Sequence, residues 1–269
     1  MKRTLYLDAD SLVYQMAHGH QKVYEWTSEL WTYVGDASGA RQALREAIFD
    51  LMDEAQCSDV VVALSCTQGN FRKVVVPTYK SNRTSAMRPV LFKPLRDMLR
   101  NEFAAQVLPW LEGDDLVSIW ATRDPSGVVC SIDKDLETTP CNLYNPNKPD
   151  RGVVLITEAE AEQAFLRQVL TGDRTDGYPG CPGMGPVRTQ ALGELTWETV
   201  VAEYVSAGQS EVEALENARC ARLLRAGEYA LSFVEKHIGV QLWHSEEFLM
   251  LEMFGTDTNA IGGGRAELG

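Results

Sequence analysis

The sequence predicts an α/β fold in which a mostly parallel sheet is flanked by helices. Apolar runs at residues 4–7, 60–64 and 127–132 are short enough to be buried strands, and stretches of helical periodicity lie between them. Strands that alternate with helices are typical of right-handed parallel crossovers. A chain of 269 residues is long enough for one large domain or two closely packed ones.

The first strand ends on Asp8-Ala9-Asp10, and a helix is expected from Ser11 onwards. We interpret His18-Gly19-His20 as a solvated loop after that helix. Ser38 is expected to cap the next helix, whose apolar positions keep one face, and the second strand follows it. Two carboxylates therefore follow the first strand, at the edge of a parallel sheet where ligands bind.

Further helices are predicted at residues 91–104, 113–123 and 157–170. Pro94 is tolerated in the first turn of the first of these, and Thr157 with Glu160 forms a capping box for the last. The strand at 127–132 ends on a second Asp-x-Asp pair, Asp133-Lys134-Asp135. After a loop at 172–185, a helix is expected near Pro186, residues 196–237 are expected to be helical, and residues 255–269 are expected to form a flexible tail.

The composition excludes several classes of protein. Its apolar runs fall short of the roughly 18 residues of a membrane span, and no signal-peptide pattern follows Met1, so we expect a cytoplasmic location. The six cysteines form no Cys-x-x-Cys pair and are expected to be reduced thiols.

The net charge of −13 taken alone argues against a nucleic-acid partner, but the charge is unevenly distributed. Between Phe71 and Asn101 Asp97 is the only acid, and the basic residues are Arg72, Lys73, Lys80, Arg83, Arg88, Lys93, Arg96 and Arg100. Few apolar residues anchor the first part of this segment, which is expected to be a loop or a pair of short helices. Such a segment is typical of a surface that follows phosphates.

The stretch Glu112-Gly113-Asp114-Asp115 places three carboxylates at the start of a predicted helix. One explanation is an exposed, well-capped helix start, since each acid gains about 0.3–1 kcal/mol from the helix dipole. The other is a hard cation such as Mg²⁺ or Mn²⁺, which takes oxygen ligands and removes the repulsion between like charges. Taken alone, the stretch leaves these two explanations about equal.

The loop at residues 172–185 contains Asp173, Asp176 and several glycines. Gly183 and Gly185 precede a helix start, where outward-pointing backbone amides suit a phosphate, and Arg188 adds a positive charge. A plain Gly/Pro loop between two helices is the alternative.

Nine carboxylates thus lie at strand ends, helix starts or in this loop: Asp8, Asp10, Glu112, Asp114, Asp115, Asp133, Asp135, Asp173 and Asp176. So many on one edge exceed the need of a single ion and fit two ions, roughly 3.5–4 Å apart, that hydrolyse a phosphodiester. The basic segment would hold the scissile phosphate.

In this order the motifs resemble the flap endonuclease/5′-nuclease family, which is PIN-like, and most of all the stand-alone 5′→3′ exonucleases of phages. The resemblance covers about residues 4–204. The motifs that carry it are Asp8-Ala-Asp10-Ser-Leu-Val-Tyr14, Phe71-Arg72-Lys73, Tyr79-Lys80-Ser81-Asn82-Arg83, Glu112-Gly-Asp114-Asp115, Asp133-Lys-Asp135 and the loop from Gly172 to Gly185.

The resemblance implies a PIN-like sheet with a helical arch and a helix-three-turn-helix element. It implies a catalytic domain at residues 1–156 with the arch at 66–93, and a DNA-binding helical region at 157–254. Two Mg²⁺ or Mn²⁺ ions would be held, the first by Asp8, Glu112, Asp114 and Asp115, with Asp10 as a further candidate, and the second by Asp133, Asp135, Asp173 and Asp176.

The catalytic residues implied are Lys80 and Arg83, on arch positions that contact the scissile phosphate, together with Asp8 and Asp115. Tyr79 would stack on a terminal base, and Gly180, Gly183 and Gly185 would grip duplex phosphates, with K⁺ bound there in relatives. The remaining nucleic-acid contacts expected are Arg72, Lys73, Arg88 and Arg188.

One departure concerns the first ion. Many relatives place an Asp after the second strand, where this chain has Ser65, Cys66 and Thr67. Either Asp10 substitutes for it or the first site is weaker.

The implied activity is removal of nucleotides from 5′ ends or flaps of duplex DNA, and of RNA primers in RNA–DNA hybrids, in phage DNA replication or degradation. A monomer is expected. The alternatives are a non-catalytic protein that recognises DNA junctions and a PIN-type ribonuclease, although the latter usually lacks the arch and the glycine hairpin.

Overall fold

The computed structural model describes residues 2–82, 87–230 and 240–245. Its central sheet has five strands in the order β4-β1-β5-β6-β7. These are β1 (Thr4–Asp8), β4 (Asp59–Ala63), β5 (Val128–Cys130), β6 (Cys141–Tyr144) and β7 (Val153–Ile156). All neighbours pair in parallel except β6 with β7, which confirms the predicted mostly parallel sheet.

One face of the sheet is covered by α1 (Asp10–Gly19), α2 (Ala37–Glu54) and α4 (Phe92–Glu102). Leu44, Ile48, Leu95 and Leu99 are fully buried against the strands there. The cap of α2 is Asp36, whose carboxylate accepts a hydrogen bond from the Gly39 amide at 2.9 Å, so the prediction of Ser38 as the cap was wrong. The predicted helix at 91–104 is confirmed in its main part, with Pro94 in its first turn.

The other face is covered by α5 (Gly113–Arg123), which has the predicted bounds. Leu116 and Val117 are fully buried there, beside Val129 of β5. Two 3-10 turns complete this part of the chain, η1 (Lys134–Thr138) and η2 (Pro149–Arg151).

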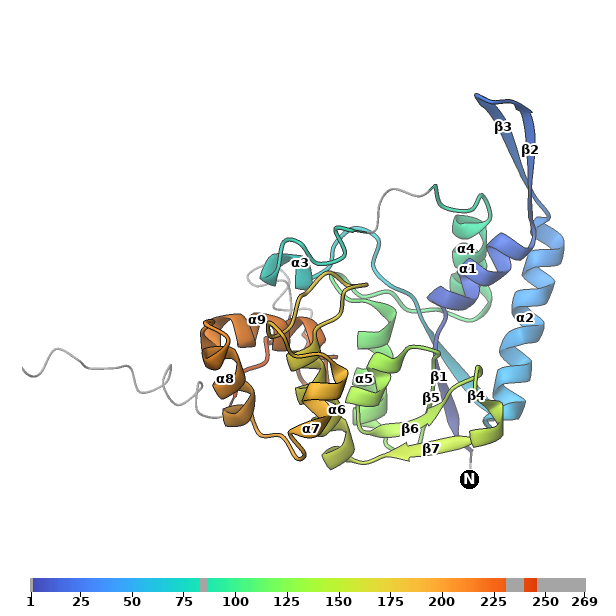
Figure 1. Ribbon diagram of the computed structural model, residues 1–269. Helices are drawn as coiled ribbons and strands as arrows, with labels where there is room; N and C mark the ends of the chain where they lie inside the picture. Colours follow the sequence, from blue (N-terminus) through green and yellow to red (C-terminus); the bar gives the residue numbers. More distant parts are fainter. Residues whose placement is uncertain (1, 83–86, 231–239, 246–269) are drawn as a thin grey trace, which may run out of the picture.

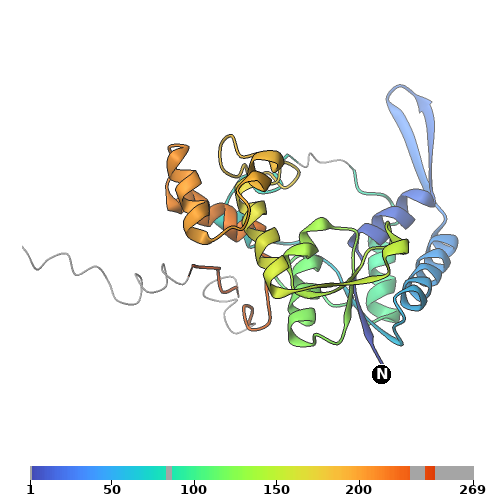
Figure 2. The same ribbon diagram turned by 60° about the horizontal axis from the view of Figure 1, so that its bottom comes forward.

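A group of helices follows on one side of the sheet, drawn from yellow to orange in Figures 1 and 2. It consists of α6 (Glu158–Thr171), α7 (Pro186–Ala191), α8 (Trp197–Ser206) and α9 (Glu211–Ala221) around its own buried cluster, which includes Phe165 and Tyr204. The capping box of Thr157 and Glu160 is confirmed. Residues 222–230 are not helical, which corrects part of the prediction for 196–237; the rest of that prediction, from 231, and the predicted tail at 255–269 lie outside the described residues.

One element was not predicted from the sequence. A long antiparallel hairpin, β2 (Gln21–Thr27) with β3 (Leu30–Gly35), follows α1 and projects from the body on the side opposite the α6–α9 helices (Figure 1). The first part of the basic segment, before α4, is mostly loop with one short helix, α3 (Arg72–Val75), among its described residues; residues 83–86 lie outside the description.

All six cysteines are free thiols, as predicted. In the described ranges we find no helix with the length and apolar character needed to cross a membrane.

Candidate functional site

Strand ends and helix starts bring the predicted carboxylates to one edge of the sheet. Asp8 is the last residue of β1 and Asp10 the first of α1, while Asp133 follows the neighbouring strand β5. Glu112 caps α5, and Asp114 lies in its first turn. Asp173 and Asp176 lie in the loop between α6 and α7.

Gly113 allows α5 to begin close to the first strand. A Cβ atom at this position would lie 2.6 Å from the Oδ1 atom of Asp8 and 3.3 Å from Oδ2 of Asp10. Any larger residue would therefore push the helix start away from both carboxylates. Glycine between Glu112 and Asp114 is what permits the two acidic motifs to meet.

Asp10 ties together the ends of neighbouring elements. Its Oδ1 atom accepts a hydrogen bond from Arg96 at 2.6 Å, and its Oδ2 atom accepts one from the Ser65 amide at 2.8 Å. The Ser65 hydroxyl in turn accepts a hydrogen bond from the Gly113 amide at 2.9 Å. Asp10 thus brings a carboxylate to the end of β4, where the sequence itself has a serine.

Asp115 lies deeper than the other acids. It is fully buried, and both of its oxygens accept hydrogen bonds from the Arg72 guanidinium, at 2.8 and 2.7 Å. Arg72 also donates to the backbone carbonyls of Cys220 and Arg222, at 2.9 and 2.8 Å. In this position Asp115 is the counterion of Arg72, and Arg72 is buried, so neither side chain faces a substrate.

Lys80 and Tyr79 lie among the carboxylates. The Lys80 ammonium forms an ion pair with Glu112 and lies 3.4 Å from the Asp176 carboxylate. The Tyr79 hydroxyl lies 2.8 Å from Glu112 and 2.9 Å from Asp176, and its ring packs against Tyr178. Tyr79 is only 2% exposed, so this arrangement does not present its ring for the expected stacking on a terminal base.

The backbone fixes Lys80 in place. Its φ angle is +53°, a left-handed conformation that few residues other than glycine adopt. Its amide donates to the Asp176 carbonyl at 2.6 Å, and a Cβ atom at Gly177 would lie 2.9 Å from the Thr78 carbonyl. The basic segment is therefore docked directly on the loop between α6 and α7.

The pKa values of Asp8 and Asp114 shift in the opposite direction to that of Glu112. Burial, followed by the charge of Asp10, raises the pKa of Asp8 to about 7. Burial, followed by the charges of Asp115 and Glu112, raises the pKa of Asp114 well above its ordinary value. Burial would also raise the pKa of Glu112, but Lys80 and Arg72 outweigh it and hold that pKa at about 2. Protein cations thus dominate at Glu112, whereas burial and neighbouring acids dominate at Asp8 and Asp114.

Asp133, Asp135 and Asp173 lie in or beside η1. The Asp133 carboxylate accepts from the Asp135 amide at 3.0 Å, and Lys134 pairs with Asp173 at 2.9 Å. Burial, then the charge of Asp133, raises the pKa of Asp135 to about 7. The Oδ1 atom of Asp135 is buried with no hydrogen-bond partner, which is costly unless a cation or water satisfies it.

These residues fit a divalent cation in their chemistry. Hard cations take carboxylate oxygens, and here they would satisfy the Asp135 oxygen and relieve the crowding of Asp8 and Asp114. In the ranges that the structure describes, no three Asp, Glu, His or Cys side chains are already grouped as a metal site. Glu112 and Asp115 are instead paired with Lys80 and Arg72.

A cleft of about 440 Å³ joins these acids to the basic segment. Its lining includes Asp10 and Glu112 together with Lys73, Lys80, Arg88 and Arg96. Lys73 and Arg88 are exposed, as a contact with phosphate requires. Arg83 lies outside the described residues.

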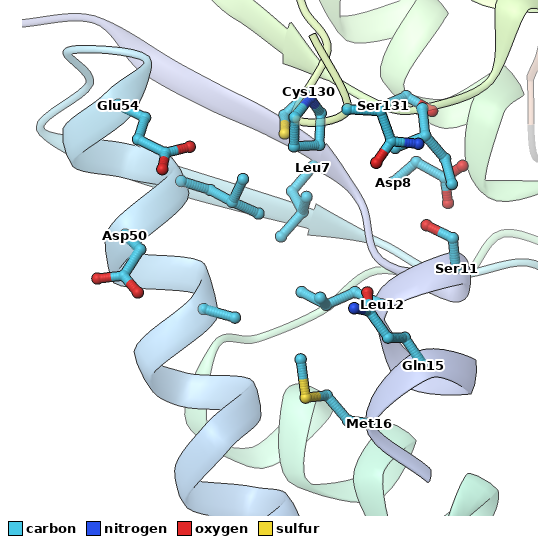
Figure 3. Close-up of a pocket in the computed structure, with 15 residues that line it drawn as sticks. Leu7, Asp8, Ser11, Leu12, Gln15, Met16, Asp50, Glu54, Cys130 and Ser131 are labelled. Carbon is cyan, nitrogen blue, oxygen red and sulfur yellow. The ribbon is translucent and has the colours of Figure 1, made fainter. Parts of the chain in front are cut away.

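A second cavity of about 420 Å³ lies between α1 and α2, with Asp8 and Ser11 near one end and Asp50 and Glu54 on α2 (Figure 3). No arginine or lysine lines it. Because a phosphate needs positive charge, the basic cleft is the stronger candidate for the scissile group.

In the loop at residues 172–185, Gly180 is buried whereas Gly183 and Gly185 are exposed. Gly180 is buried and packs against Gly172, and its amide donates to Asn217 at 2.8 Å, so it is not available to a phosphate. Gly183, Gly185 and Arg188 are exposed, and Arg188 pairs with Glu203 at 3.3 Å. Only this outer part of the loop can contact nucleic acid as placed here.

Comparison with known proteins finds two curated sequence relatives of similar length, whereas no family model matches. The exonuclease of Escherichia phage T7 is 28% identical over 90% of this chain and 93% of its own length. The exodeoxyribonuclease of Enterobacteria phage T3 is 29% identical over the same shares.

Solved structures share the fold. The T5 5′-exonuclease with bound zinc superposes with a TM-score of 0.61 at 15% identity, over 83% of this chain and 90% of that protein. The flap endonuclease of bacteriophage T5, solved with DNA and metal ions, gives a TM-score of 0.57 at 14% identity, over 82% and 93% of the two chains. The chain is thus similar in sequence to two phage exonucleases over most of its length, and it shares its fold with the T5 5′-exonuclease.

Proposed function

We propose that this protein is a divalent-metal-dependent 5′→3′ exonuclease and flap endonuclease that hydrolyses phosphodiester bonds at 5′ ends of duplex DNA. The observation that carries the proposal is the meeting of two acidic groups with Lys80 beside a cleft lined by exposed basic residues. The names of the relatives, exonuclease and exodeoxyribonuclease, and the T5 flap endonuclease crystallised with DNA and metal ions support it.

In this mechanism the first ion would be held by Asp8, Glu112 and Asp114. Asp10, which pairs with Arg96, and the buried Asp115 are further candidates. The second would be held by Asp133, Asp135, Asp173 and Asp176. When bound, the ions would supply Lewis-acid chemistry at the scissile phosphate.

The other residues act on the phosphate directly. Lys80 would leave Glu112 once a cation neutralises that carboxylate, and would then stabilise negative charge that develops on the phosphate oxygens. Arg83 is assigned the same role from its motif. Lys73 and Arg88 would hold neighbouring phosphates, and the exposed Gly183, Gly185 and Arg188 would hold the duplex further along.

Several finer assignments belong to the same proposal. The ions would be Mg²⁺ or Mn²⁺, K⁺ would bind at the glycine hairpin, and RNA primers paired with DNA would also be cleaved. One chain supplies every residue named, so we propose that the active unit is a monomer. The work of the enzyme would be phage DNA replication or degradation in the host cytoplasm.

The test uses blunt and 5′-flapped duplexes labelled at the 5′ end, incubated with Mg²⁺, Mn²⁺ or EDTA. Short labelled products are expected only with metal. The Asp133→Ala/Asp135→Ala variant is expected to bind the duplexes but not to cleave them, while Asp150→Ala, which removes an exposed acid in η2, is expected to behave as wild type.

Two results would contradict the proposal. DNA binding without cleavage by the wild-type protein under every metal condition would indicate a non-catalytic binder. Cleavage of single-stranded RNA with the DNA duplexes left intact would indicate a PIN-type ribonuclease.

A further inference from the structure

The β2–β3 hairpin exposes an apolar surface that the catalytic site does not use. Each of six large apolar side chains on it is at least 48% exposed: Val23, Tyr24, Trp26, Leu30, Trp31 and Val34. A two-stranded hairpin has little stability of its own, so these side chains gain little by lying there unless something covers them. Exposed patches of this kind mark interaction sites.

The hairpin is joined to the basic cleft at its foot. Helix α1 begins at Asp10 in the site, and a single residue, His20, separates its end from β2. The Gln21 side chain accepts a hydrogen bond from the Val90 amide at 2.8 Å, and Gly35 lies so close to Leu91 that a Cβ atom would be 2.6 Å from Leu91 Cγ. The hairpin is thus fixed to the segment that carries Arg88 (Figure 1).

Aromatic and basic side chains connect the cleft with this foot. Phe92 lines the cleft, with the Arg88 guanidinium 5.0 Å above its ring. Tyr14 packs on Phe92 with ring centroids 4.8 Å apart and stacks on His18, one turn further along α1, at 6.3 Å. These ring contacts lead from the cleft along α1 as far as His18, in the last turn of the helix.

The pairing register separates the hairpin into two faces of different charge. Lys22 pairs with Val34 and Tyr24 with Thr32, so Lys22 and Tyr24 share one face. The register shifts between Glu25 and Thr27, and the Trp26 indole donates to the Thr32 hydroxyl at 3.1 Å, which places Trp26 on that same face. Glu25 pairs with Trp31 on the opposite face. Both faces therefore carry aromatic rings, but the first also carries a lysine and the other an acid.

We propose that the Lys22, Tyr24 and Trp26 face binds the single-stranded 5′ segment of the DNA substrate by stacking on its bases. A duplex would need dense positive charge, and the hairpin has one lysine against Glu25 and Glu29. Unstacked bases need ring faces, which Tyr24 and Trp26 supply, and stacking is tolerant of sequence. The proposal rests on the proposed function, since it names the part of that substrate which the hairpin holds.

The experiment measures binding in EDTA, so that cleavage plays no part. Fluorescence anisotropy compares duplexes whose 5′ flaps range from none to about 16 nucleotides, a length that covers the usual stacking site sizes. Wild-type affinity is expected to increase with flap length. Tyr24→Ala/Trp26→Ala is expected to lose that increase, about tenfold in Kd on the longest flap, with unchanged binding of the blunt duplex.

Two variants serve as controls. Trp31→Ala removes a similarly exposed ring from the acidic face and is expected to keep wild-type flap binding. Tyr24→Phe/Trp26→Phe keeps both rings and is expected to restore it. Photocrosslinking of a flap that carries 5-bromodeoxyuridine is expected to label Tyr24 or Trp26 and not Trp31.

Two outcomes of the binding experiments would overturn the inference. Flap binding that is independent of length, or equally weakened by Trp31→Ala, would exclude this face as a strand-binding surface. A dimer in sedimentation that Tyr24→Ala/Trp26→Ala dissolves, with flap binding unchanged, would assign the face to a second copy of the chain. Failure of wild-type cleavage in Mg²⁺ would refute the proposed nuclease and leave the EDTA binding result to decide the hairpin separately.

Discussion

Replacing Arg72 by methionine is expected to destabilise the protein strongly, because it leaves a buried carboxylate without its partner. Arg72 is 1% exposed and Asp115 is fully buried, and two hydrogen bonds of 2.8 and 2.7 Å join them. Although burial lowers the pKa of Arg72, Asp115 and Glu112 outweigh it, so this side chain remains charged. Methionine has a similar length and no charge.

The magnitude follows from the burial of the pair. Removing one partner of a buried ion pair costs about 3–5 kcal/mol, because the other charge stays buried and unpaired. The carbonyls of Cys220 and Arg222 also lose their donor, which places Arg72→Met toward the upper end of that range. Domains are usually stable by only about 5–15 kcal/mol, so the loss should be a large fraction of the total.

The assay is urea unfolding followed by circular dichroism, on Arg72→Met, Asp115→Leu and the double variant. The double variant is expected to be more stable than the sum of the single losses predicts, by about 2–3 kcal/mol, because no charge remains unpaired. Arg45→Ala is the control, since Arg45 and Glu102 form an ion pair in which both side chains are 40% exposed, and a cost below about 1 kcal/mol is expected. Equal losses for Arg72→Met and Arg45→Ala would refute the reasoning from burial.

Two further predictions concern the site. Lys80→Met is expected to reduce the cleavage rate about 10²–10³-fold with little change in duplex binding, because it removes a charge aimed at the phosphate. Lys73→Ala, at an exposed position, should have a much smaller effect on the rate. Similar rate losses in the two variants, measured in single-turnover assays, would contradict this. Asp8 and Asp135 have a pKa of about 7 in the folded chain against an ordinary value of 3.8, so the metal-free folded state holds protons that the unfolded state releases between about pH 4 and 7. Stability is therefore expected to fall as the pH rises through this range, with a melting temperature several degrees lower near pH 8 than near pH 5, and with Mg²⁺ reducing the difference. A melting temperature that rises with pH in EDTA would show that these carboxylates are not protonated in the folded state.

Local sequence patterns predicted most of the helices and strands, but they could not choose between two residues that are equally suited to the same position. Ser38 and Asp36 are both good helix caps, and the path of the chain into α2 selected Asp36. The hairpin was missed because residues 27–30 contain none of the glycine or asparagine typical of a tight turn, and because apolar residues occur on both of its faces. Helix α9 ends at Ala221, although the sequence predicted that the helical region would continue. The next carbonyl, that of Arg222, accepts a hydrogen bond from Arg72 instead.

Within the site, local sequence patterns do not predict the burial of Arg72 and Tyr79. A basic residue in a basic segment is normally exposed to phosphates, and an aromatic residue beside Lys80 is available for stacking. Both are buried here, because the segment docks on α5, α9 and the loop before α7. That docking depends on residues more than 30 positions away in the chain, so no local pattern reports it.

The sequence by itself determined the parallel α/β class, the acidic motifs at the strand ends and the basic segment, because periodicity, strand composition and residue type are local properties. The tertiary structure alone decided which charges meet. It brought Lys80 to Glu112 and Asp176 and placed Asp115 under Arg72. It also placed Asp8, Asp114 and Asp135 where burial and neighbouring acids raise their pKa values. The physical reason is that charge interactions depend on distance and burial, and both are set by how separate elements pack.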